Sequence, residues 1–431
     1  MSINELAHLV KEASIKLAGV KAEQKNNALA QIAEALKNSK EEIIAANQVD
    51  LRRCREENLP DPLLKRLNFD ETKINDVVDG IFSLIKLEDP VGKTLLATEL
   101  DDGLELYKVT CPIGVIGVIF ESRPDALVQI STLCLKSGNG VILKGGAEAK
   151  ETNRVLAEVI IRATKEAGIP SNWITLIETR SDVNEMLKLD EYIDLIIPRG
   201  SNEFVRYIMD NSKIPVMGHA DGICHSYVDD DVDIAKAVKI IVDSKTQYVS
   251  VCNALETLLV HKEIAPTFLP ELQKALKSKR VEVIGCPETC AIIPATPATE
   301  EDWKTEYLDY KLSIKVVLGL DEAINHINKY GSGHTDAILT KDKNKASRFM
   351  EYVDSGNVFW NCSTRFSDGF RYGFGAEVGV STGKIHSRGP VGLEGLVIYK
   401  FKLIGNGHIV EDYANRTRKF KHTKLNQEFS L

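Results

Sequence analysis

Short apolar, β-branched runs alternate with helical stretches from residue 115 onward, and this alternation constrains the fold more than any other feature of the chain. Turn signals such as Ser137-Gly138-Asn139-Gly140 separate the runs from helical stretches, two of which span 126–136 and 148–167. Strands linked through helices lie parallel and bury both faces of their sheet. We therefore predict one doubly wound α/β domain over 115–225, with strands at 115–120, 140–144, 173–178 and 194–198.

A second α/β series follows, and it predicts a second domain. Strands are expected directly after Cys252, at 281–285 and at 356–361, with helices near 232–246, 263–278 and 343–354. Residues 3–58 have the spacing of amphipathic helices that pack as a cap on another element, and 396–404 has the pattern of an edge strand. A chain of 431 residues is too long for one ordinary core, which agrees with at least two domains.

The charge balance excludes several classes of partner. A net charge of −8 argues against non-specific binding to nucleic acid or to anionic membranes, and it favours small polar substrates. The basic segment 414–424 is accordingly expected to be a solvated extension rather than a nucleic-acid-binding arm. The longest apolar stretch, 113–120, is far shorter than the ~20 residues that span a bilayer, so we predict no membrane insertion.

Cysteine usage indicates the compartment. Eight cysteines are scattered without a disulfide framework, which predicts a reducing environment and, by default, the cytosol. The first residues carry acidic side chains at helical spacing and resemble neither a signal peptide nor a transit peptide. Cys286 and Cys290 lack the CxxC spacing of the usual zinc half-site, and His219 with His225 makes no ligand set, so we predict no metal site.

Cys252 is the candidate of greatest interest because it lies at a junction between a helix and an apolar strand, in QYVSVCNALETLLV. A thiol at such a junction can face a cleft. A free thiol has a pKa near ~8.5, so a nucleophilic cysteine needs surroundings that favour the thiolate. Free cysteines are also among the most buried residue types, so a buried packing role is the alternative.

Other polar residues follow the predicted strands, although neither GxGxxG nor a P-loop occurs. Gly200 and Ser201 stand at a helix start, where backbone donors can hold a cofactor anion or where an ordinary N-cap forms. Lys144 ends a strand and could reach a ribose or phosphate. Glu121 and Arg123 also follow a strand directly, a position that often serves function.

His219 and Asp221 form a candidate acid–base pair, although a loop histidine is more often simply hydrogen-bonded.

Five segments in order resemble one family over residues 5–405. The γ-glutamyl phosphate reductases, within the aldehyde dehydrogenase superfamily, are similar to this chain in VIFESRPD (118–125), IIPRGSN (196–202), GHADGICH (218–225), CNALETLL (252–259) and the glycine-rich stretch 361–396. The resemblance implies an aldehyde-dehydrogenase-like α/β fold with two doubly wound α/β domains and a small β oligomerisation arm. It assigns 1–102, 115–225 and 365–395 to cofactor binding, 226–364 to catalysis, 103–114 and 396–408 to the arm, and 409–431 to a C-terminal extension.

The resemblance also implies roles for single residues. Cys252 would be the nucleophile, and Ser122 would stand where related enzymes place an oxyanion-hole donor. Lys144 would meet the adenosine ribose of NADP(H), and Glu306 the nicotinamide ribose. Hydrolytic relatives carry a glutamate some 34 residues before the thiol, but that position is Gly218 here. Without a base that activates water, a thioester on Cys252 should persist until it meets hydride or phosphate.

The function implied is NADPH-dependent reduction of L-glutamyl 5-phosphate to L-glutamate 5-semialdehyde and phosphate through a Cys252 thioester, the second step of proline biosynthesis. Arg123 and Arg365 are candidates for phosphate or α-carboxylate contacts, with structural ion pairing as the alternative for each. Glu121, His219 and Asn361 are further candidate substrate contacts.

A cytoplasmic homo-oligomer is expected, with possible transient contact with glutamate 5-kinase. Two alternatives remain: a coenzyme-A-acylating or phosphorylating dehydrogenase of another substrate, and a cysteine hydrolase or transferase that uses His219 or His225 and no nicotinamide.

Overall fold

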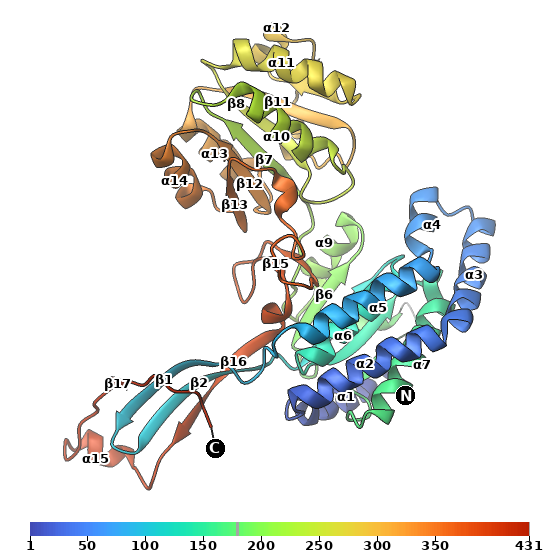
Figure 1. The fold of residues 1–431 in the computed structure, drawn as a ribbon, viewed down its shortest axis with the longest axis vertical. Helices are drawn as coiled ribbons and strands as arrows, with labels where there is room; N and C mark the ends of the chain where they lie inside the picture. Colours follow the sequence, from blue (N-terminus) through green and yellow to red (C-terminus); the bar gives the residue numbers. More distant parts are fainter. Residues whose placement is uncertain (178–180, 431) are drawn as a thin grey trace. The chain divides into compact units, whose positions relative to one another are not determined.

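The computed structural model describes residues 1–177 and 181–430, and the chain divides into two compact units (Figure 1). Unit 1 comprises Met1–Met217 and Gly392–Leu431, and unit 2 comprises Gly218–Val391. The predicted boundaries at 225/226 and 364/365 therefore differ from this division, because 218–225 and 365–391 belong to unit 2. The reason is hydrogen bonding within unit 2: strand β7 (Cys224–Val228) begins inside the first of these segments and pairs with two other strands of the unit.

Unit 1 contains the predicted parallel sheet, with strand order β5-β4-β3-β6. Every residue of β3 and β4 is buried, which explains the apolar runs at 115–120 and 141–143. The strands are β3 (Val115–Phe120), β4 (Gly140–Gly145), β5 (Ile174–Ile177) and β6 (Leu195–Arg199), and the helices α6 (Pro124–Lys136), α7 (Lys150–Glu166), α8 (Ser181–Met186) and α9 (Asn202–Asn211) follow them. The predicted strands are thus confirmed, while Glu178, the predicted last residue of one strand, lies outside the described residues.

The N-terminal helices form the expected cap on this sheet. Ile3, Ala7 and Val10 of α1 pack in one cluster with Val115 and Ile119 of β3. A capping box at Ser2 and Glu5 begins α1. The helices are α1 (Ile3–Leu17), α2 (Ala22–Asn38), α3 (Lys40–Glu56), α4 (Asp61–Leu67) and α5 (Glu71–Lys86), of which the last two were not predicted.

A separate antiparallel sheet with strand order β16-β2-β1-β17 forms the arm of unit 1 (Figure 1). Its strands are β1 (Thr94–Asp101), β2 (Leu104–Pro112), β16 (Val397–Ile404) and β17 (Thr423–Lys424), and α15 (Val410–Ala414) lies between the last two. The structure confirms that 397–404 is an edge strand. The predicted arm omitted β1, which the sequence analysis had assigned to the cofactor domain.

Residues 414–424 are exposed or half-buried, as expected for a solvated segment, but the C-terminal end is not a free extension. β17 pairs with β1, and Leu425 and Phe429 pack against a small cluster that includes Tyr107. The backbone N–H of Phe429 also donates to Thr94 Oγ1 at 2.8 Å. The tail is therefore held by apolar contacts that its basic composition concealed.

Unit 2 is built on a seven-stranded sheet with order β10-β9-β11-β8-β7-β12-β13, in which the paired strands run parallel. Besides β7, its strands are β8 (Leu255–His261), β9 (Glu282–Gly285), β10 (Thr296–Pro297), β11 (Lys311–Val317), β12 (Thr335–Leu339) and β13 (Asn357–Trp360). Its helices are α10 (Ile234–Thr246), α11 (Ala265–Ser278), α12 (Pro287–Ile292), α13 (Leu320–Tyr330) and α14 (Lys343–Tyr352), and a hairpin pairs β14 (Gly379–Ser381) with β15 (Gly389–Val391). Strands β7, β11 and β12 were not predicted.

Short 3₁₀ turns complete the two units: η1 (Ala147–Ala149) and η4 (Leu393–Leu396) in unit 1, and η2 (Glu301–Lys304) and η3 (Thr364–Phe366) in unit 2. Across the described residues, helices that combine the length and the apolar character needed to cross a bilayer are absent.

Candidate active site

Three neighbouring strands of unit 2 begin at one edge of the sheet, and reactive side chains stand just before them. Cys252 lies in the turn before β8, His219 in the loop before β7, and His334 directly before β12. Because β8, β7 and β12 are parallel neighbours, these three side chains converge, and one ligand-type atom of each lies within 4.8 Å of the others. The predicted placement of Cys252 between a helix and a strand is confirmed, and its side chain is partly exposed.

Backbone from the GHADGICH segment lies against Cys252. A Cβ atom added at Gly222 would lie 2.2 Å from the carbonyl oxygen of Cys252 and 2.4 Å from its Cα. The thiol of buried Cys224 donates to the same carbonyl oxygen at 3.2 Å. Glycine is therefore required at position 222, since any side chain would displace the turn that carries the thiol.

Hydrogen bonds tie the STRFS segment to the same turn. Asn253 Nδ2 donates to the carbonyl of Ser367 at 2.7 Å, and Thr364 Oγ1 donates to the carbonyl of Asn253 at 2.8 Å. These bonds hold η3, and with it Arg365, next to the residue that follows Cys252. Both segments resemble one family in sequence, and the structure brings them together in unit 2.

Arg365 brings a buried positive charge to this site. Its side chain is 8 % exposed, and Nε donates to Gln247 Oε1 at 2.9 Å. Burial lowers the pKa of Arg365, the nearby charge of Arg371 lowers it further, and the charge of a Cys252 thiolate acts in the opposite direction. A guanidinium held in this way near the thiol can attract an anionic group of a ligand.

The two histidines differ in their surroundings. His219 Nδ1 lies 2.8 Å from the carbonyl of Val380, and because a carbonyl only accepts, Nδ1 donates and the lone pair of a neutral ring is on Nε2. His334 is fully buried, with Nδ1 2.7 Å from Thr335 Oγ1, and its Nε2 has no hydrogen-bond partner. His334 is not among the residues predicted from the sequence, although it follows a Gly-Ser-Gly turn that precedes a strand.

Glu306 follows η2, in a loop that a buried ion pair supports. Lys245 Nζ and Glu256 Oε2 are 2.6 Å apart with both side chains fully buried, and Glu256 Oε1 accepts from the backbone N–H of Leu308 at 3.4 Å. Burial raises the pKa of Glu256 to about 7, and Lys245 opposes that shift. The pair thus anchors residues next to Glu306.

The predicted cofactor residues of unit 1 lie at or beyond the carboxyl ends of its strands. Lys144 is buried near the end of β4, with Nζ donating to the carbonyl of Gly145 at 2.5 Å. Ser201 is the N-cap of α9 and accepts from the backbone N–H of Phe204, which confirms the N-cap alternative. The backbone N–H of Ser201 also donates to Glu121 Oε2 at 3.3 Å, and a Cβ at Gly200 would approach that oxygen to 2.5 Å. The start of α9 therefore accommodates a carboxylate.

Ser122 has an unusual backbone and a specific partner. Its φ of 50° is rare for a residue other than glycine. Its N–H and its Oγ both donate to Glu148 Oε1, at 2.5 and 3.0 Å.

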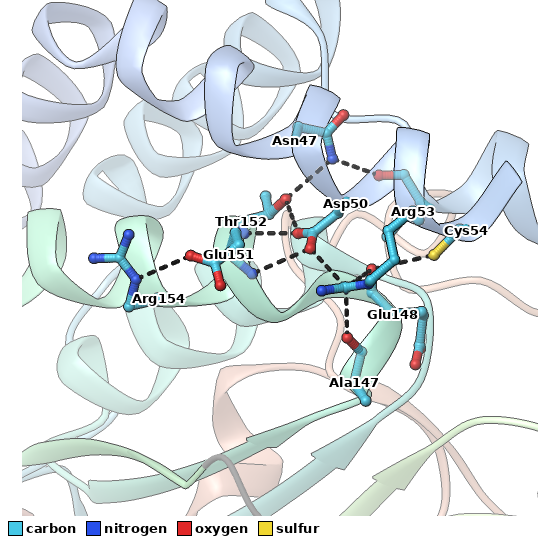
Figure 2. A network of polar contacts seen from close by, with 10 residues as sticks. Asn47, Asp50, Arg53, Cys54, Ala147, Glu148, Glu151, Thr152 and Arg154 are labelled. Atoms are coloured by element: carbon cyan, nitrogen blue, oxygen red, sulfur yellow. Dashed lines mark hydrogen bonds and ion pairs between the residues drawn. The ribbon is translucent and has the colours of Figure 1, made fainter. Parts of the chain in front are cut away.

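Figure 2 shows how α3 anchors the segment that carries Glu148. Asp50 accepts from the backbone N–H and hydroxyl of Thr152, and Arg53 donates to the carbonyls of Ala147 and Glu148. Asp50 is fully buried at the start of α7, where its charge is favoured by the helix dipole.

Two other predicted substrate contacts have structural positions. Arg123 is the N-cap residue of α6, which continues with proline. Asn361, with φ of 56°, pairs its side-chain amide with the backbone of Thr340: Oδ1 accepts at 3.0 Å and Nδ2 donates at 2.9 Å. A structural role is sufficient to explain Asn361.

The partly exposed thiol of Cys252, at the start of a strand in a parallel sheet, defines an α/β protein with a candidate cysteine nucleophile. Comparison with known sequences identifies its family. The profile of the aldehyde dehydrogenase family matches residues 2–289. The chain is 74 % identical, over its full length, to γ-glutamyl phosphate reductases of Pelotomaculum thermopropionicum and Acetivibrio thermocellus, covering 99 % and 100 % of those proteins. The chain therefore belongs to the aldehyde dehydrogenase family and, within it, to the γ-glutamyl phosphate reductases.

Solved structures agree with this assignment. The crystal structure of γ-glutamyl phosphate reductase from Thermotoga maritima superposes with a TM-score of 0.93 at 43 % identity, covering 95 % of this chain and 100 % of that one. An acetylating aldehyde dehydrogenase from Geobacillus thermoglucosidasius, 18 % identical, shares the fold with a TM-score of 0.65 over 94 % of this chain and 97 % of that one. The predicted fold class is confirmed.

Proposed function

We propose that this chain catalyses the reduction of L-glutamyl 5-phosphate to L-glutamate 5-semialdehyde, with release of phosphate, as the second step of proline biosynthesis from glutamate. The observation that carries the proposal is the partly exposed thiol of Cys252 with the buried guanidinium of Arg365 beside it. A nucleophile and a fixed cation are what attack on an acyl phosphate requires. The names of the full-length relatives support the choice of substrate.

The proposed chemistry begins with the Cys252 thiolate, whose sulfur bonds to the substrate carbonyl carbon while the carbon–oxygen bond to phosphate breaks. The phosphate takes up one proton and leaves as the dianion HPO4²⁻, and a thioester remains. When bound, NADPH supplies the hydride that reduces this thioester to a thiohemiacetal, which releases the aldehyde and restores the thiol. His219, whose Nε2 lone pair is fixed by the bond from Nδ1 to Val380, is our candidate for receiving the thiol proton.

The residues of unit 1 fit a nicotinamide dinucleotide. The start of α9 already accepts a carboxylate from Glu121, and Gly200 keeps that position clear of a side chain. We propose that Gly200 and Ser201 lie against a cofactor phosphate and that Lys144 contacts the adenosine ribose. Glu306, which belongs to unit 2, is our separate candidate for contacting the nicotinamide ribose. Preference for NADP over NAD is part of the proposal.

Ser122 remains our candidate for the oxyanion donor. Its hydroxyl donates to Glu148 Oε1 in this structure, so stabilising an oxyanion would require that the hydroxyl turn from this carboxylate. The backbone N–H of Cys252 is the second proposed donor, and one such donor contributes ~3–4 kcal/mol where it has been removed elsewhere. Arg123 stays a candidate for the substrate phosphate or α-carboxylate, and Glu121 for a polar substrate contact.

The arm supports a proposed homo-oligomer. β16 is an edge strand whose Ile398, Phe401 and Leu403 are 47 %, 60 % and 58 % exposed. An exposed apolar edge of this kind is a template for pairing with another chain. We further propose a cytoplasmic location, and transient contact with the glutamate 5-kinase that would supply the unstable acyl phosphate.

The test is NADP⁺ reduction with glutamate 5-semialdehyde, with and without phosphate, on the wild type, on Cys252→Ala and on Cys290→Ser. Turnover should require phosphate, disappear in Cys252→Ala and persist in Cys290→Ser, because Cys290 lies on α12 and its thiol donates to the carbonyl of Gly285. Turnover without phosphate would indicate a hydrolytic dehydrogenase. Absence of turnover in the wild type would favour a different substrate or a cysteine hydrolase.

A further inference from the structure

We propose that His219, Cys252 and His334 form a binding site for a zinc-like divalent cation, and that the bound ion reversibly blocks the thiol. Sequence spacing gave no reason to group the three residues, since 33 and 82 positions separate them along the chain. The order of β8, β7 and β12 brings them to one edge of the unit 2 sheet. One ligand-type atom from each lies within 4.8 Å of the other two.

The donor set matches the preference of zinc. Thiolate and neutral imidazole are its usual ligands, at about 2.3 and 2.0–2.1 Å, so ligand atoms of a tetrahedral site lie roughly 3.5 Å apart. Since the three atoms lie within 4.8 Å of one another, each pair has to approach by at most about 1.3 Å. Cys252 lies in a turn and His219 in a loop, and both are partly exposed, so these two can approach a cation without moving a strand.

In each of the two histidines Nδ1 takes part in a hydrogen bond, and Nε2 is the atom that would bind the cation. His219 Nδ1 donates to the carbonyl of Val380, which places the lone pair of the neutral ring on Nε2, the arrangement seen for metal-bound histidines whose other nitrogen is held by a carbonyl. His334 is fully buried and its Nε2 lacks a partner, a costly state for a polar atom. The two rings are close and nearly perpendicular, with centroids 4.8 Å apart and an interplanar angle of 73°.

Three protein ligands define an open site that retains a position for water. Binding exchanges the thiol proton for the ion: the S–H bond breaks, the proton leaves to solvent, and sulfur bonds to the cation without any change of oxidation state. The sulfur can then no longer attack a carbonyl carbon. The binding stands on geometry alone, whereas the inhibition rests on the proposed function of Cys252.

The first test uses Co²⁺ as a spectroscopic probe on chelator-treated, reduced wild-type protein without substrate. We expect one Co²⁺ per chain and a thiolate-to-cobalt charge-transfer band in the near ultraviolet, which Zn²⁺ displaces. The band should vanish in Cys252→Ala and persist in Cys290→Ser, the matched control for an unrelated thiol. His219→Gln and His334→Gln should each weaken Co²⁺ binding at least ~10-fold, since each removes one of three ligands. A band that is absent from the wild type, or unchanged in both histidine variants, would overturn the site.

The second test needs no variant, which guards against misfolding of the buried His334 substitution. Zn²⁺ should protect Cys252, but not Cys290, from iodoacetamide as mapped by mass spectrometry, and a chelator should restore labelling. Equal labelling of Cys252 with and without Zn²⁺ would refute the site. Zn²⁺ that protects Cys252 and yet leaves turnover intact would retain the site and instead refute the role of Cys252 in the proposed function.

Discussion

Replacing Gly222 with alanine should reduce turnover strongly, because the added Cβ would clash with Cys252. The added Cβ would lie 2.2 Å from the carbonyl oxygen of Cys252, 2.4 Å from its Cα and 2.6 Å from its Cβ. These atoms belong mainly to backbone, which cannot rotate away. The turn that carries Cys252 must therefore retreat by more than about 1 Å to restore ordinary van der Waals contact.

The expected magnitude follows from that displacement. A misplacement of 1 Å at a reacting group costs on the order of 10²-fold in rate, and overpacking of this kind costs roughly 1–3 kcal/mol of stability. We therefore expect kcat of Gly222→Ala to fall about 100-fold while the protein still folds. The rate of Cys252 alkylation by iodoacetamide should change as well, because the position of the thiol changes.

The matched control is Gly80→Ala in the middle of α5, where an added Cβ would meet nothing within 4 Å. Alanine in a helix interior is favoured over glycine by roughly 0.5–1 kcal/mol, so this variant should be slightly more stable and fully active. If Gly222→Ala keeps wild-type kcat and wild-type alkylation of Cys252, the inferred contact between the two segments is refuted.

Three further predictions concern charged groups of unit 2. Arg365→Gln should lower kcat/KM for phosphate by roughly 10–100-fold, because a charge-assisted hydrogen bond is worth about 1.5–3 kcal/mol. Arg365→Lys should recover part of the loss. Unchanged steady-state constants in Arg365→Gln would exclude anion binding by Arg365. Glu256→Gln should cost about 3–5 kcal/mol in urea unfolding because it leaves Lys245 buried without its partner, whereas Glu271→Gln at an exposed pair should cost less than about 1 kcal/mol. Burial, with smaller contributions from neighbouring charges, lowers the pKa of His326 from 6.5 to about 2. As the pH falls below 6.5, His326 therefore binds a proton in the unfolded chain but stays neutral in the folded protein. Between about pH 7.5 and 5 the wild type should therefore lose about 2 kcal/mol of unfolding free energy that His326→Gln does not lose.

Strands with a clear local run of apolar residues could be predicted from the sequence, whereas β7 and β12, which lack one, could not. β3 and residues 141–143 of β4 are apolar runs because both faces of their sheet are covered. In contrast, β7 and β12 contain the fully buried residues His225 and Asp336, which are joined by a hydrogen bond from the backbone N–H of His225 to Asp336 Oδ1 at 2.7 Å. These two residues are 111 positions apart, so a short window of sequence cannot predict their hydrogen bond.

The same distinction applies to the candidate site. Cys252 was recognisable because a helix, a polar turn and an apolar strand are adjacent in sequence. His334 was missed because its proximity to Cys252 depends on strand order, which local spacing does not specify. Gly222 lies in a segment that the sequence analysis matched to a family, yet only its distance from Cys252 explains why that position has no side chain.

The pairing of β2 with β16 has a consequence for how the chain is made. Leu104–Pro112 finds its partner in Val397–Ile404, so about 290 residues must be translated between the two strands, which takes roughly 15–60 s at the usual rate of synthesis. Unit 2 is one uninterrupted segment, and the ribosome delivers all of it during that interval. The arm is consequently the last part of the molecule to close, and a ribosome that stalls near residue 391 would have synthesised unit 2 while the β1–β2 hairpin still lacked both of its partner strands, β16 and β17.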